Sequence, residues 1–210
     1  LKLLKNLSAA EIYDQVEMIR GLADRHYDKN LSNIVYMGMG EPLLNYSAVL
    51  ESIDRICGEP GLGMSPKRIT VSTAGIAKAI KRLGDDEVRF NLALSLHAAN
   101  DEKRNRIMAI NESNNLEALA EALKYFHERT GTRVTYEYII FKDFNDDLDD
   151  ARELAAFCEH VPCKVNVIEY NPIDDGDFKQ ASDEVLNMYM DLLEKNGIIV
   201  IASFVSPYRE

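Results

Sequence analysis

The sequence lacks most features that would place it in a special class of protein. It has no Trp, only three Cys and no apolar run of about 18 residues, the length that spans a membrane. Its first residues, 1–5, contain too short an apolar stretch for a signal peptide. We therefore expect a cytoplasmic protein without membrane contact.

Cysteine is too scarce for a disulfide framework. Cys57, Cys158 and Cys163 are odd in number and widely spread, so we interpret them as buried thiols in a reducing compartment. Cys158 and Cys163 are separated by four residues on a predicted helix-to-strand turn, and we expect no zinc or cluster site there. The sequence also has no Gly-x-Ser-x-Gly nucleophile elbow, which argues against a hydrolase.

The sequence has fewer basic than acidic residues. The chain has 24 Lys and Arg against 35 Asp and Glu, and its formal net charge of −11 repels phosphate backbones at long range. We interpret the local basic clusters at 67–68, 78–82 and 103–106 as solvated helix faces, with RNA contact as the alternative. With 46% hydrophobic and 28% charged residues, the composition is that of one globular domain, which we predict over 1–210.

Helical and strand patterns alternate along the chain. Ser8 and Glu11 form a capping box that predicts a helix to about Asp28, and the β-branched run 33–37 that follows is typical of a buried strand. Further helices are predicted at 47–57, 76–83, 116–126, 148–158 and 185–193, and further strands at 68–73, 89–96, 134–141, 164–169 and 198–205. Such alternation indicates an α/β protein with a parallel sheet, either doubly wound or closed into a (β/α) barrel.

Ligands of parallel α/β sheets bind beyond the carboxyl ends of the strands. The first predicted strand runs into 38–42, where glycines allow close backbone approach and Glu41 suits a ligand with an ammonium group. A simple turn is the alternative. Polar side chains also end three other strands, namely Ser72, the pair Ser95 and His97, and Asn171. A lone His or an Asn before Pro is commonly structural, so the hypothesis of a ligand site depends on their convergence at one rim.

Longer blocks resemble one family, in that family's order. They are 37–45 (MGMGEPLLN), 68–75 (RITVSTAG), 94–102 (LSLHAANDE) and 165–172 (VNVIEYNP), with 110–111 and 144–146 as further family features. Over about residues 7 to 197 the chain resembles the radical S-adenosylmethionine methyltransferases that modify carbon 2 of an adenine in 23S ribosomal RNA and transfer RNA. The methyltransferases of carbon 8 are a close alternative, although 41–45 is more like the carbon-2 group.

The resemblance implies a fold, a cofactor and partners. The fold would be a partial (β/α)6 radical-SAM barrel lacking the first strand and the cluster loop, without the family's N-terminal RNA-binding domain. S-adenosylmethionine would contact Gly40, Glu41, Ser72, Ser95, Leu96, His97 and Asn171, with Gly40 and Glu41 at its amino group. The family also uses a [4Fe–4S] cluster held by Cys-x-x-x-Cys-x-x-Cys and a methyl-carrying Cys near the C-terminus. The three cysteines match neither, and the tail 201–210 departs from the family pattern.

Our hypothesis is therefore a fragment or truncated member of this family, monomeric and inactive by itself, with no catalytic residue assigned. A non-catalytic S-adenosylmethionine-binding or scaffold module is the alternative from another class. An aldolase-like barrel that uses Lys164 or His97 is disfavoured, because Lys164 begins its predicted strand and would lie at the rim opposite the pocket.

Overall fold

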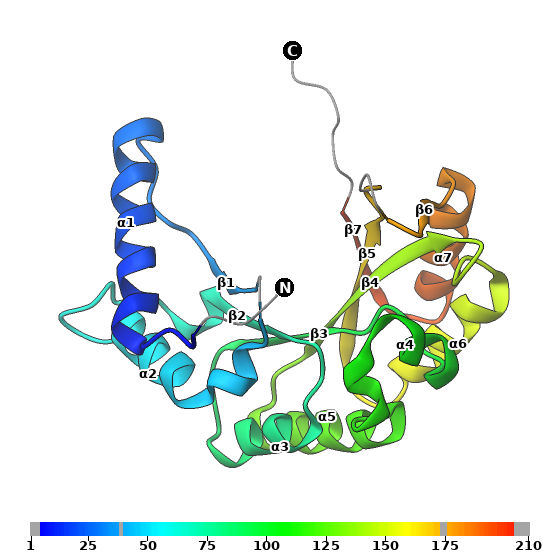
Figure 1. The fold of residues 1–210 in the computed structure, drawn as a ribbon, viewed down its shortest axis with the longest axis horizontal. Coiled ribbons are helices and arrows are strands. Elements are labelled where there is room, and N and C mark those ends of the chain that lie inside the picture. The colour runs from blue at the N-terminus through cyan, green and yellow to red at the C-terminus, as the bar shows by residue number, and fades with distance from the viewer. Residues whose placement is uncertain (1–4, 38–39, 173–175, 204–210) are drawn as a thin grey trace. The chain divides into compact units, whose positions relative to one another are not determined.

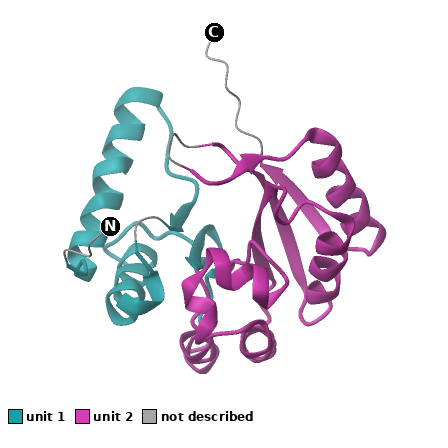
Figure 2. Ribbon diagram, turned by 45° about the vertical axis from the view of Figure 1, so that its right-hand side comes forward, with its two compact units in different colours: residues 1–73, 88–92 teal, residues 74–87, 93–210 magenta. Residues whose placement is uncertain are grey.

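The computed structural model describes residues 5–37, 40–172 and 176–203 (Figure 1). The chain divides into two compact units (Figure 2). Unit 1 comprises residues 1–73 and 88–92, and unit 2 comprises residues 74–87 and 93–210. In the described ranges, no helix is both long enough and apolar enough to cross a lipid bilayer.

Unit 1 joins two amphipathic helices to a pair of parallel strands. Its elements are α1 (Ala9–Tyr27), β1 (Ile34–Tyr36), the 3-10 helix η1 (Pro42–Asn45), α2 (Tyr46–Cys57), the 3-10 helix η2 (Pro66–Arg68) and β2 (Ile69–Thr73). The capping box predicted for the first helix is confirmed, because Ser8 and Glu11 each accept a backbone N–H of the other. Ile34 of β1 pairs with Ile69 of β2, and the buried side chains of α2 and β2 form the core.

Unit 2 contains the larger part of the parallel sheet. Its elements are α3 (Ala77–Asp85), β3 (Asn91–Ser95, which begins in unit 1), α4 (Asp101–Ile107), the 3-10 helix η3 (Ala109–Glu112), α5 (Leu116–Thr130), β4 (Val134–Lys142), α6 (Leu148–Cys158), β5 (Cys163–Glu169), β6 (Lys179–Gln180), α7 (Asp183–Lys195) and β7 (Ile199–Ser203). The strands β3, β4, β5 and β7 pair in parallel in that order, and β6 pairs antiparallel with β4. The predicted α/β class with a parallel sheet is confirmed.

The sheet of unit 2 has one aromatic face and one polar face. Tyr136 and Tyr138 of β4 are fully buried, and their rings lie 5.4 Å from Phe157 of α6 and 5.8 Å from Tyr189 of α7. Side chains alternate along a strand, so Glu137 between them points to the opposite face. The helices α6 and α7 therefore cover one face, and the other keeps polar side chains.

The six predicted strands are confirmed, whereas the short elements were not foreseen. The two-residue β6 and the seven-residue α4 are too short to give a periodic pattern. The interpretation of the cluster 103–106 as a solvated face is wrong for Arg104, which is fully buried. The interpretation of the cysteines as buried thiols holds for Cys158, but Cys57 and Cys163 are only half-buried; all three are free. The last two residues of the predicted final strand, 204–205, lie outside the described residues.

Arg104 ties the carboxyl end of β3 to two neighbouring segments. Its guanidinium donates to the carbonyl oxygens of Leu96 at 3.1 Å, Ser95 at 3.2 Å and Ala74 at 2.7 Å, and to Oδ1 of Asn111 at 2.6 Å. Burial lowers the pKa of Arg104 to about 10, while the Asp101 carboxylate opposes that change. The side chain therefore stays charged at neutral pH and fixes the backbone where β3 ends.

Replacing Arg104 with Met should destabilise the chain by about 3 kcal/mol or more, because four hydrogen bonds of a buried guanidinium are lost. Urea unfolding followed by circular dichroism measures this change. Arg152→Met on α6 is the matched control, since its guanidinium is exposed and pairs with exposed Asp149; its effect should stay within about 0.5 kcal/mol. Equal unfolding midpoints for the two variants would contradict the role given to Arg104.

Candidate functional site

The segment after β1 carries the first predicted site residues. Gly40 has a φ of +116°, a backbone conformation that side-chain-bearing residues rarely adopt. Glu41 caps η1, and its Oε1 accepts a hydrogen bond from the backbone N–H of Leu43 at 3.0 Å. The same oxygen accepts the hydroxyl of Thr73 at 2.7 Å. Gly38 and Met39 of the predicted glycine turn lie outside the described residues.

The end of β2 contributes Ser72 and Thr73 to unit 1. Both are buried, with exposed fractions of 5% and 1%. The sequence analysis names Ser72 and not Thr73, because side chains alternate along a strand and Thr73 shares a face with the core residue Val71. Its position as the last residue of the strand is the signal that could have found it. The Glu41 carboxylate is thus oriented by one donor from η1 and one from β2.

The end of β3 places Ser95, Leu96 and His97 next to one another in unit 2. Ser95 is half-buried, and its hydroxyl has no hydrogen-bond partner among the described residues. The side chain of Leu96 is fully buried, and its backbone N–H donates to the carbonyl of Glu137 at 3.0 Å. An extended strand would place His97 on the same face as Ser95, but the φ of +55° at His97 ends the extended strand and redirects the chain.

His97 is held at both its ring and its backbone. Its Nδ1 accepts the backbone N–H of Ile139 at 3.2 Å, and its carbonyl accepts Nδ2 of Asn145 at 2.7 Å. Burial, with the nearby positive charge of Arg104, lowers the pKa of His97 to about 4. The imidazole is therefore neutral at neutral pH.

Two further family features identified in the sequence support this strand end. Asn145 is fully buried, and besides its bond to His97 it donates to the carbonyl of Ile139 at 2.9 Å and accepts the N–H of Phe141 at 2.7 Å. Asn111 accepts the Arg104 guanidinium. Asn145 thus fixes the backbone at His97, and Asn111 fixes the guanidinium of Arg104.

A chain of polar side chains crosses the face of the unit 2 sheet that α6 and α7 do not cover. Ser95 is in register with Glu137 of β4, which is in register with Asn166 of β5. Nδ2 of Asn166 donates to Oε2 of Glu137 at 2.7 Å, and the hydroxyl of Ser203 donates to Oδ1 of Asn166 at 2.7 Å. Burial raises the pKa of Glu137, although Asn166 and Lys164 act in the opposite direction.

The sequence reasoning missed Glu137 and Asn166. Side chains alternate along a strand, which places Thr135, Glu137 and Ile139 on one face of β4, and this pattern could have identified Glu137 as a residue of a polar face. Asn171 follows the end of β5 and is exposed, with no hydrogen bond among the described residues. Among those residues, no group of three or more His, Cys, Asp or Glu side chains is placed to hold a metal ion.

The chain is similar to curated RNA methyltransferases. It is 56% identical over 200 residues to the probable dual-specificity RNA methyltransferase RlmN of Christiangramia forsetii, covering 95% of this chain and 57% of that protein. The corresponding protein of Cytophaga hutchinsonii is 56% identical over 93% of this chain and 54% of its own length. The chain therefore spans a little over half the length of these relatives.

Solved structures agree with the fold. A radical SAM methyltransferase from Sphaerobacter thermophilus superposes with a TM-score of 0.91 at 36% identity, covering 96% of this chain and 59% of that one. SuiB of Streptococcus suis, in a structure bound to S-adenosylmethionine, superposes with a TM-score of 0.68 at 17% identity, covering 97% of this chain and 45% of that one. The second likeness concerns the fold alone.

The family model described as the radical SAM superfamily matches residues 8–155, which is more than half of the chain. The match includes the segment after β1, the end of β2 and the end of β3, where the sequence analysis placed most of the site. Together with the parallel α/β sheet of a partial radical-SAM barrel, this match shows that the chain belongs to the radical SAM superfamily.

Proposed function

We propose that this chain is the S-adenosylmethionine-binding part of a radical SAM RNA methyltransferase. Its substrate would be carbon 2 of an adenine in 23S ribosomal RNA and transfer RNA, and the protein would act as a cytoplasmic monomer. The observation that carries this proposal is the 56% identity, over 95% of the chain, to relatives called dual-specificity RNA methyltransferases. The bound cofactor and a [4Fe–4S] cluster would supply the radical chemistry, and the residues of this chain would bind and orient the cofactor.

The side chains of unit 1 have the chemistry that the amino-acid end of S-adenosylmethionine requires. Glu41 presents a carboxylate, the natural partner of an ammonium group, and Thr73 and Leu43 hold it in one orientation. Gly40 has no side chain to block the approach of a ligand to the backbone. We propose that Gly40, Glu41 and Ser72 contact the cofactor from this unit.

Unit 2 offers neutral hydrogen-bonding groups, which suit a ribose and an adenine. Because Nδ1 of His97 accepts a hydrogen bond while the ring is neutral, its proton is on Nε2. Nε2–H has no acceptor among the described residues and is available as a donor. We propose that Ser95, His97 and Asn171 contact the cofactor by side chain. Leu96 would contact it through the main chain, because its side chain is in the core.

Binding of the cofactor can be measured directly by titration calorimetry of this chain with S-adenosylmethionine. Glu41→Gln and Ser95→Ala should each weaken binding about tenfold, the effect of losing one charge-assisted or buried hydrogen bond. Glu51→Gln on α2 and Ser113→Ala after η3 are exposed controls and should bind as the unchanged chain does. Unchanged affinity in both site variants would remove the support for these contacts.

RNA methylation can be tested in a chimera. Residues 8–200 replace the matching segment of the Christiangramia forsetii relative, in a bacterium whose own enzyme has been deleted. Mass spectrometry of nucleosides from ribosomal and transfer RNA should detect 2-methyladenosine, and Glu41→Gln in the chimera should reduce it. Detection of 8-methyladenosine instead would contradict the proposed reaction. So would the absence of methylation from a folded chimera that binds S-adenosylmethionine normally.

The neutral state of His97 predicts a pH-dependent stability. Its pKa rises from about 4 in the folded chain to about 6.5 in the unfolded chain, so the unfolded chain takes up the proton first. The stability that the neutral His97 contributes is fully present above about pH 6.5. It is lost as the pH falls towards 4, which lowers the free energy of unfolding by up to about 3 kcal/mol.

Urea unfolding at pH 7, 6 and 5 should therefore show a smaller loss of stability in His97→Asn than in the unchanged chain. Asn does not titrate and tolerates a positive φ. His26→Asn, at an exposed position near the end of α1, should retain the full loss. Identical pH profiles for His97→Asn and the unchanged chain would show that His97 is not the group responsible.

A further inference from the structure

Two thiols meet at the amino end of β5, the opposite end of that strand from the candidate site. Cys158 is the last residue of α6, and Cys163 is the first residue of β5. The turn 159–162 between them is fixed to the sheet, because the carbonyl of Pro162 accepts the N–H of Val134 at 3.2 Å. The proximity of the two cysteines is therefore set by the pairing of β4 with β5.

The two thiols interact but are not equivalent. Sγ of Cys163 lies 3.7 Å from the carbonyl oxygen of Cys158 and donates to it. Cys158 is buried, with 7% exposure, whereas Cys163 is half-buried. The neighbouring Cys163 thiol, and then burial, raise the pKa of Cys158. The Cys158 thiol and the charge of Arg133 lower the pKa of Cys163, whereas burial acts in the opposite direction. Cys163 therefore loses its proton first.

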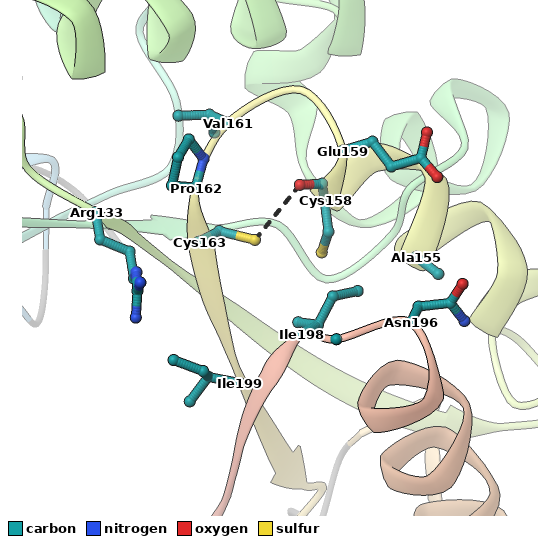
Figure 3. Close-up of a pocket in the computed structure, with 11 residues that line it drawn as sticks. Arg133, Ala155, Cys158, Glu159, Val161, Pro162, Cys163, Asn196, Ile198 and Ile199 are labelled. Carbon is teal, nitrogen blue, oxygen red and sulfur yellow. Dashed lines mark hydrogen bonds between the residues drawn. The ribbon is translucent and has the colours of Figure 1, made fainter.

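A cavity of about 400 Å³ lies beside the pair, and both cysteines line it (Figure 3). Figure 3 shows the sulfur of Cys163 directed towards Cys158, with Ile198 and Asn196 beyond them and Arg133 on the other side of β5. The space is large enough for a small molecule, and the guanidinium adds a positive charge at its wall. A small anionic reagent can therefore reach the more reactive thiol.

We propose that Cys163 is a modification site for small-molecule disulfides and that Cys158 is its resolving thiol. The thiolate of Cys163 attacks one sulfur of the disulfide, the sulfur–sulfur bond breaks, and the leaving thiolate takes a proton from water. Cys158 then loses its proton to solvent and attacks the sulfur of Cys163, which forms the Cys158–Cys163 disulfide and releases a second thiol. The two cysteines lose two electrons, and these reduce one small disulfide to two thiols.

Cys57 provides a comparison within the same chain. It is a half-buried thiol at the end of α2, and burial raises its pKa, with the Asp54 carboxylate adding to that effect. Cys57 and Cys163 are both half-buried, but their surroundings shift the two thiol pKa values in opposite directions. A difference in reaction rate between Cys57 and Cys163 is therefore due to the neighbouring Cys158 thiol and Arg133, because the two cysteines are similarly exposed.

The test exposes the folded full chain to oxidised glutathione at pH 7, blocks the remaining thiols at timed intervals and maps every cysteine by peptide mass spectrometry. Cys163 should react about tenfold faster than Cys57. The product in the unchanged chain should be the Cys158–Cys163 disulfide, and Cys158→Ser should stop at one glutathione on Cys163. Arg133→Gln, at an exposed position, should slow the reaction of Cys163 and leave that of Cys57 unchanged.

Circular dichroism before oxidation checks that each variant is folded, and the unchanged chain alone is sufficient for the main comparison. The proposal is overturned if Cys57 is modified as fast as Cys163. It is also overturned if the Cys158–Cys163 disulfide forms only in denaturant, because the native turn would then hold the thiols in an unreactive geometry.

Discussion

The guanidinium of Arg104 is the interaction on which the candidate site of unit 2 depends most. It occupies a fully buried position and joins two carbonyls at the end of β3 to the carbonyl of Ala74 and the amide of Asn111. A buried charge is tolerated when its donors are used, and here each of four contacts is to a backbone carbonyl or an amide oxygen. The backbone that leads into Ser95 and His97 is therefore rigid before any ligand arrives.

The two faces of the sheet in unit 2 have different roles: one packs against helices and the other carries polar side chains. Aromatic rings of β4 pack against α6 and α7, which supplies the apolar burial that stabilises the fold. The other face is then free to carry Glu137, Asn166 and Ser203 in one hydrogen-bonded chain. Polar groups on such a face are compatible with stability because they form hydrogen bonds with one another.

Much of the architecture could be predicted because short stretches of the sequence indicate its helices and strands. Each of the six main strands has its own run of β-branched or apolar residues, and α1 has a capping box that needs only Ser8 and Glu11. The family blocks at 37–45, 68–75 and 94–102 were also recognisable locally. What failed were judgements about burial: Arg104 was assigned to a solvated face and is fully buried, and Cys57 and Cys163 are half-buried where burial was expected.

The sequence by itself determined the order and type of the main elements, the superfamily and most of the residues proposed to contact the cofactor. Only the tertiary structure decided which partners these residues meet. Thr73 orients Glu41 and Asn145 holds His97 because strands and loops distant in sequence are brought into contact. Cys163 lies against Cys158 because the turn between them is fixed to β4. Alternation along a strand depends on neighbouring residues alone, whereas pKa values, tautomers and thiol reactivity depend on what packs around a side chain. That environment exists only in the folded chain.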